Sequence, residues 1–180
     1  NFRFDCQTLV STTGRTPAFE LYQHDLSTRS TQLVNGQDGG SEVIFREDNQ
    51  TSFPVSGDGR VVYFITDSSP VSAAVDGPVD DIFRFDSTPA AGSRTRLISK
   101  PAAGATGVGA AGTSDLSFDP NERRISADGR YVIFLSNAAN LVAGQNDRNS
   151  AQDAFLFDRM NGTLKLLSST GDGRTTRPRG

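Results

Sequence analysis

One loop in the C-terminal third of the chain gathers oxygen-bearing side chains at short spacing. Within residues 145–153, Asp147, Asn149 and Asp153 offer the carboxylate and amide oxygens that Ca²⁺ prefers as ligands. The full spacing of a calcium-binding loop is not met, because Ala151 stands where a further oxygen is needed and no glutamate closes the site. The three residues are the candidate metal ligands of the chain, and the alternative is that they cap turns and begin strands.

Other residues with catalytic potential do not form a recognisable constellation. His24 is the single histidine, and a general base of a hydrolase needs an oriented nucleophile and an acid beside it. Cys6 is the single cysteine, so it cannot form an internal disulfide and is interpreted as a buried or turn thiol. In the second unit, Asp76, Asp80 and Asp81 offer oxygens in the loop that matches 145–153. Further acids and arginines are scattered through loops: Glu42, Glu47 and Glu122, and Arg15, Arg46, Arg123 and Arg124. No spacing brings two carboxylates together as glycosidases require, so we expect no catalytic residues and no enzyme activity from this chain.

Composition narrows the classes of partner. The formal net charge is -3 and the pI is near 5.1, which gives no basic field for phosphates. We therefore expect no nucleic-acid binding and no attraction to anionic membranes. No apolar run approaches the roughly 20 residues that a membrane-spanning helix needs, and no signal-peptide-like segment opens the chain. Because the chain begins at Asn1 without methionine, we expect a processed mature protein or an excerpt of a longer one.

The chain contains internal repeats, and these determine the expected fold. The segment 55–65 resembles the segment 125–135, with Ser-x-Asp-Gly-Arg followed by an apolar run in both. A second block, an acid followed by a short apolar run and an aspartate, recurs at 20–25, 81–86 and 153–158. Each copy of the second block is followed by a turn-rich stretch and another short apolar strand.

The repeated blocks have the pattern of antiparallel strands joined by tight turns. Asp-Gly between two apolar segments predicts a hairpin, with glycine supplying the positive φ of a primed turn. The runs 61–65 and 131–135 are continuously apolar, which predicts strands buried on both faces. In the second block the phenylalanines alternate, so both lie on one face, and His24 aligns with Phe85 and Phe157, which favours aromatic packing. We expect the flanking aspartates to accept hydrogen bonds from turn amides.

Four antiparallel strands per unit, with long loops between them, are typical of the blades of a β-propeller. The two blocks in this order resemble the TolB-like, WD40-like repeat (PD40 type) of bacterial envelope and secreted proteins. The match is best at 125–168, good at 55–99 and degenerate in the first unit, where Asp5-Cys6-Gln7 stands in place of Asp-Gly-Arg. The chain has no tryptophan, so it lacks the Trp-Asp ending of true WD40 blades and the aspartate box of sialidases.

The sequence therefore predicts an all-β chain of about three antiparallel four-stranded propeller blades. The expected units are a degenerate blade at 1–50, a blade with a long Gly/Ala-rich loop at 51–120, and the best-matching blade at 121–180. Three blades cannot close a ring, so we expect a partial propeller completed by further blades, by other chains or by copies of itself, with a filament as a further form.

The resemblance implies a non-enzymatic, extracytoplasmic bacterial module, periplasmic, cell-surface or secreted, for protein–protein binding or structural assembly. Rigid blades that present variable loops suit such contacts. One alternative is the accessory or gating propeller of a secreted hydrolase, such as a prolyl-oligopeptidase-type peptidase. Another is a calcium-dependent adhesion module, in which calcium would be the only cofactor.

Overall fold

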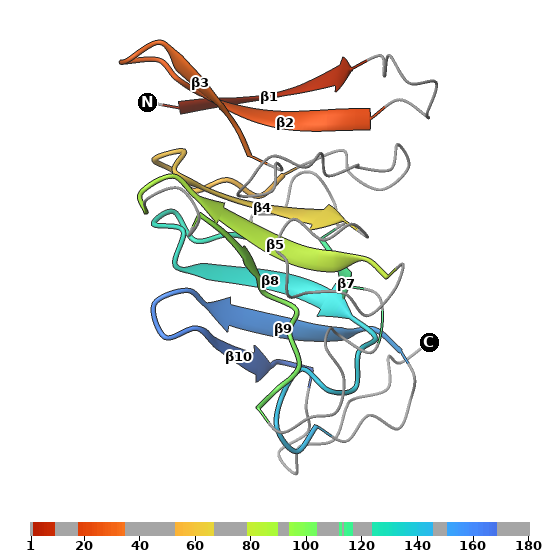
Figure 1. Ribbon diagram of the computed structural model, residues 1–180. Coiled ribbons are helices and arrows are strands. Elements are labelled where there is room, and N and C mark those ends of the chain that lie inside the picture. Colours follow the sequence, from red (N-terminus) through yellow and green to blue (C-terminus); the bar gives the residue numbers. More distant parts are fainter. Residues whose placement is uncertain are drawn as a thin grey trace.

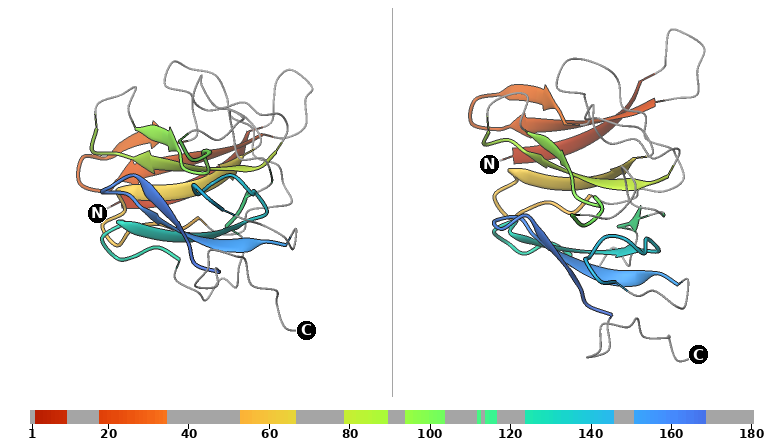
Figure 2. Two further views of the ribbon diagram at one scale, coloured as in Figure 1. Left: turned by 90° about the horizontal axis from the view of Figure 1, so that it is seen from below. Right: turned by 60° about the horizontal axis from the view of Figure 1, so that its bottom comes forward.

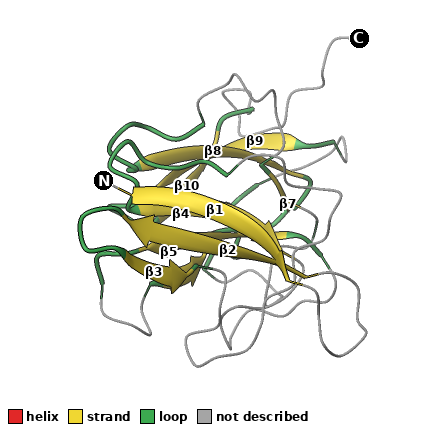
Figure 3. Cartoon of the chain, turned by 90° about the horizontal axis from the view of Figure 1, so that it is seen from above, coloured by secondary structure: helices red, strands yellow, loops and turns green. Residues whose placement is uncertain are grey.

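The computed structural model describes the larger part of the chain. The described residues are 2–9, 18–34, 53–66, 79–89, 94–103, 112, 114–116, 124–145 and 151–168. Every regular element in these ranges is a β-strand, which confirms the predicted all-β class (Figure 3). A search of the same ranges finds no helix with the length and apolar character needed to cross a membrane.

The strands form three separate antiparallel sheets (Figure 1). The first sheet contains β1 (Phe2–Leu9), β2 (Ala18–Asp25) and β3 (Ser30–Leu33) in that order. The second sheet contains β4 (Val61–Thr66), β5 (Asp81–Asp86) and β6 (Thr95–Leu97). The third sheet contains β7 (Ser114–Asp115), β8 (Tyr131–Ser136), β9 (Asp153–Asp158) and β10 (Thr163–Leu166), so only this sheet has four strands in the described ranges.

Strand pairing places the repeated blocks at equivalent positions in the three sheets. The aspartate that ends each block pairs with the first residue of the preceding strand: Asp25 with Phe2, Asp86 with Val61, and Asp158 with Tyr131. The expectation that Asp5-Cys6-Gln7 replaces an Asp-Gly-Arg turn is wrong, because these residues lie inside β1. The first unit thus begins with its strand at Phe2, the position that Val61 holds in the second sheet.

In the second and third sheets, the edge of β4 or β8 that faces away from β5 or β9 carries only short pairings in the described residues. In the third sheet β7 pairs with the far end of β8, and Ile125 forms a single bridge with Val132 at the near end. Two separate segments thus flank the same edge of β8, although β7 precedes residue 120, the predicted end of the second unit. In the second sheet the corresponding edge of β4 carries the bridge between Val55 and Val62.

The sheets stack face to face, with the second sheet between the other two (Figures 1 and 2). They stand in a row, and the described strands do not join the first sheet to the third in a ring. The side chains of β4 alternate between two apolar cores, because successive residues of a strand point to opposite faces. Val62 and Phe64 belong to the core shared with the first sheet, and Val61 and Tyr63 belong to the core shared with the third sheet.

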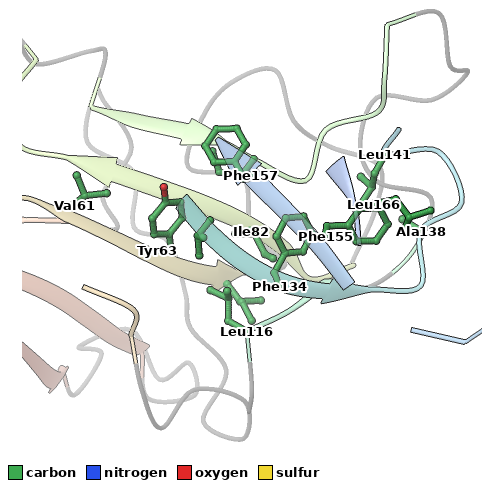
Figure 4. Close-up of a cluster of buried hydrophobic side chains, with 13 residues drawn as sticks. Val61, Tyr63, Ile82, Leu116, Phe134, Ala138, Leu141, Phe155, Phe157 and Leu166 are labelled. Atoms are coloured by element: carbon green, nitrogen blue, oxygen red, sulfur yellow. The ribbon is translucent and has the colours of Figure 1, made fainter. Parts of the chain in front are cut away.

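The larger core fills the space between the second and third sheets (Figure 4). Its aromatic centre includes Phe134 and Phe155, whose rings stack with centroids 5.5 Å apart. Every residue of β4 and β5 is buried, as predicted for the run 61–65. The same prediction for 131–135 is wrong, since β8 buries alternate residues only. One face of the third sheet therefore lacks the cover that both faces of the second sheet have.

Candidate binding surface

The Ser-x-Asp-Gly-Arg motif is a rigid turn whose polar groups are engaged in holding its own backbone. In the second sheet the Ser56 hydroxyl donates to Asp58 (2.7 Å) and accepts a hydrogen bond from the Val61 amide (3.0 Å). The Arg60 amide also donates to Asp58 (3.1 Å), and the Gly59 amide donates to the Ser56 carbonyl (2.9 Å). The turn at Ser126 repeats this arrangement. The motif therefore positions strands and leaves no activated nucleophile.

The turn differs from the predicted primed type. A primed type I′ turn needs positive φ at both central residues, whereas here φ is positive at Gly59 (70°) and Gly129 (69°) but not at the aspartates before them. The two motif turns also touch each other, because the Gly57 amide donates to the Ala127 carbonyl at 2.8 Å. A Cβ at Gly129 would lie 2.9 Å from the Ser56 Cβ, so the glycine permits the close stacking of neighbouring sheets.

The predicted calcium ligands are only partly within the described residues. Asp147 and Asn149 lie outside them, so the proposed site remains a prediction. Asp153 is buried at the start of β9 and accepts a hydrogen bond from the Ser168 hydroxyl (2.7 Å). Asp81 accepts the same kind of bond from Ser99 (2.6 Å), so this acid joins the start of one strand to the end of the next in both sheets. The described residues contain no group of three or more His, Cys, Asp or Glu side chains that could hold a metal.

The remaining polar candidates are dispersed over the described part of the chain. His24 lies near the end of β2, where its Nδ1 shares a hydrogen bond with the Thr31 hydroxyl (2.8 Å) on β3. Arg124 is buried beside the bridge residue Ile125. Glu42, Glu47, Asp76, Glu122, Arg15, Arg46 and Arg123 lie outside the described residues, and so does the side chain of Cys6.

The aspartates at the strand ends accept turn amides, as predicted. Ser27, Thr88 and Met160 donate their backbone amides to Asp25, Asp86 and Asp158 at 2.8, 3.0 and 2.9 Å. The hydrogen bonds from the Ser27 hydroxyl and amide are the main cause that lowers the pKa of Asp25 to about 2. The side-chain hydrogen bond from Arg130 is the main cause that lowers the pKa of Asp158. All three acids are therefore ionised at neutral pH and stabilise their turns.

One of these acids also joins two sheets. Arg159, in the turn after β9, places its Nη1 2.7 Å from an oxygen of Asp86, which is 3% exposed. Burial raises the pKa of Asp86, but the hydrogen bonds from Thr88 and the charges of Arg84 and Arg159 outweigh it, so the net pKa is lowered. Burial also raises the pKa of Tyr63 and lowers that of Arg84, its partner across β4 and β5. The face of the second sheet that the third sheet covers thus holds a charged cluster at one end of an apolar surface.

One face of the third sheet packs on the second sheet. Its other face carries side chains at the positions that are buried in the first and second sheets, but here they are not covered. Leu167 is 41% exposed, whereas Ile98 and Val34, which make the same backbone hydrogen bond in the other two sheets, are 3% and 1% exposed. Ile133 is 36% exposed, and Tyr63 at the same position in the second sheet is fully buried. We call this the uncovered face. Its apolar side chains are Tyr131, Ile133, Leu135, Ala154, Leu156 and Leu167, and the exposed Lys165, which pairs with Leu156, lies on the same face.

The repeat in the sequence already contained the signal for this surface. Positions that match the buried Val61, Tyr63 and Ile65 are apolar in the third unit too, and no other sheet of the described residues covers them. Because both apolar runs match strands buried on both faces, the pattern alone does not single out Ile133 or Leu167. A comparison of the sequence with models of known families and with curated proteins gives no match.

Proposed function

We propose that the chain is a non-enzymatic module of propeller-type blades that uses an open sheet face for protein–protein binding or structural assembly. The observation that supports this is the difference in burial between Leu167 and its counterparts Ile98 and Val34. Exposed apolar side chains in a contiguous row are typical of an interaction surface in a soluble domain. The face-to-face stacking of the described sheets, in which the two motif turns touch, supports the proposal that they are propeller-type blades.

The chemistry of the described polar residues supports binding over catalysis. The serines, aspartates and glycines of the two motif turns are engaged within those turns, and His24 is bonded to a threonine hydroxyl. The resemblance to TolB-like repeats supports an extracytoplasmic place for the module.

A photo-crosslinking experiment tests this function. Ile133 is replaced with p-benzoylphenylalanine, because the equivalent position in the second sheet is Tyr63 and an aromatic side chain fits there. The matched control carries the same residue at Met160, which is 68% exposed but lies in a turn outside the uncovered face. Irradiation of cells that make the full protein should give a protein adduct from position 133 and none from position 160. If position 133 gives no protein adduct, the proposed binding function is wrong.

A further inference from the structure

We infer that the partner of the uncovered face is the first sheet of a second copy of this chain, packed as the third sheet packs on the second. This inference rests on the proposed function, because it treats the sheets as blades that stack in one direction. The matching surface on the second copy is the outward face of its first sheet.

Each sheet has two different faces, and stacking always joins one kind to the other. The aromatic pair of β5, Phe83 and Phe85, packs towards the first sheet, and the aromatic pair of β9, Phe155 and Phe157, packs towards the second sheet. The other faces of the first and second sheets receive these aromatics. Among the described sheets one face of each kind therefore stays open: the aromatic-position face of the first sheet and the receiving face of the third.

The outward face of the first sheet carries apolar side chains at positions that are buried or partly buried in the other two sheets. Tyr22 pairs with Leu33, so both lie on one face, as Phe83 pairs with Leu97 and Phe155 pairs with Leu166 in the other sheets. Leu166 is 8% exposed and Leu97 packs against the core, whereas Leu33 is 38% exposed. Among the large hydrophobic side chains exposed in the described residues, Leu33 lies on the outward face of the first sheet, and Ile133 and Leu167 lie on the uncovered face. The other two, Leu26 and Met160, lie in the turns after β2 and β9.

The charges at the sheet ends agree with this pairing. Asp86 takes its cation from the following sheet, through Arg159. In the first sheet the position of Arg159 is held by Leu26, which is 48% exposed and cannot neutralise an acid. Asp158, which would face Leu26 of the second copy, is instead held within its own sheet by two bonds from Arg130, at 3.0 and 2.9 Å. The junction between copies would therefore bury no unpaired carboxylate.

Because two different faces meet, the contact is heterologous, and such contacts form rings when their rotation closes. Two copies supply twice the three sheets found in the described residues, and a ring of about six blades lies within the range of closed propellers, about four to eight. Closure of a two-copy ring covers both open faces at once. The expected assembly is therefore a dimer with two identical junctions.

Sedimentation velocity on the purified chain tests the inference with complementary variants. L33E blocks the outward face of the first sheet and L167E blocks the uncovered face, since both replace an exposed leucine with a charge. We expect the unmodified chain and the control M160E to sediment as dimers, and each blocked variant alone to sediment as a monomer. An equimolar mixture of L33E and L167E should form a heterodimer, because one junction between two unaltered faces remains. Circular dichroism should show that both monomers keep the β-sheet spectrum and unfold cooperatively.

Several outcomes would overturn the inference. An unmodified chain that stays monomeric over an about 100-fold range of protein concentration, up to its solubility limit, would do so. An L33E variant that still dimerises would also do so, because it would indicate a contact between two identical uncovered faces. A mixture of the two variants that stays monomeric would also contradict it. If the photo-adduct at position 133 contains a different protein while the purified chain stays monomeric, this inference is wrong and the proposed binding function stands.

Discussion

Replacing Arg159 with methionine removes the guanidinium that joins the third sheet to Asp86 and keeps most of the apolar stem. Asp86 is 3% exposed, so its carboxylate would stay buried without its closest cation. Breaking a buried ion pair from one side costs about 3–5 kcal/mol. Here the cost is reduced, because the Arg159 side chain is 23% exposed and because the Thr88 amide and hydroxyl still donate to Asp86 at 3.0 and 2.6 Å. We expect a loss of about 2–3 kcal/mol in the free energy of unfolding, or roughly 5–10 °C in Tm.

The loss should depend on pH in a defined direction. The folded-state pKa of Asp86 is lowered, so its contribution to stability is present above the unfolded pKa of about 3.9 and is lost as the pH falls through the folded pKa. Without Arg159 the folded pKa rises, and the variant gains less from ionisation. The difference in stability between the unmodified chain and R159M should therefore be largest near pH 7 and shrink below about pH 4.

Urea denaturation followed by circular dichroism measures this difference at each pH. The matched control is R60M, because Arg60 lies 3.9 Å from Asp58 and both side chains are more than half exposed, so its loss should be small. The double variant D86N/R159M should recover part of the stability, since it leaves no buried charge without its partner. A cost for R159M no larger than that for R60M, or one that does not change between pH 7 and pH 3, would refute the reasoning.

Four further substitutions test the core, the turns and the strand ends. F134A removes a fully buried ring between the second and third sheets and should cost about 3–5 kcal/mol in urea denaturation. G129A should cost about 2–3 kcal/mol, because φ is +69° and the new Cβ would lie 2.9 Å from a side-chain atom of the second sheet's turn. G162A, with φ of +65° and nothing within 4 Å, should cost only about 1 kcal/mol, and equal losses for the two glycines would contradict the stacking of the turns. S27A should raise the pKa of Asp25 from about 2 towards 3.8 in a ¹³C NMR titration, and an unchanged midpoint would show that the Ser27 hydroxyl is not the main cause.

The repeated blocks were sufficient to predict β4 to β6 and β8 to β10, whereas β7, which lies in the stretch expected to be a long Gly/Ala-rich loop, was not predicted. Alternating phenylalanines in β5 and β9 fixed which residues share a face, and the aspartates at the strand ends accept turn amides as their side-chain chemistry favours. The first sheet was harder to place, because it lacks the Asp-Gly-Arg block and only its later block could be aligned. Its strand β1 begins at Phe2, so Asp5-Cys6-Gln7 was assigned to a turn in error.

The candidate surface could not be predicted from either apolar run alone. Tyr63 and Ile133 occupy the same position in two similar strands, yet one is fully buried and the other is 36% exposed. Periodicity reports which side chains point to the same face of a strand, but it carries no information on whether another sheet covers that face.

The sequence by itself determined the local features of this protein. These are the all-β class, the repeating unit, the glycine-dependent turns and the sets of side chains that share one face of a strand. These follow from backbone sterics and from contacts between residues near one another in the chain. Only the tertiary structure decided the order of stacking, the pairing of Arg159 with Asp86 across sheets, and the exposure of Leu167. The physical reason is that burial depends on which distant segment lies against a residue, and equal local patterns meet different neighbours in a chain of three sheets.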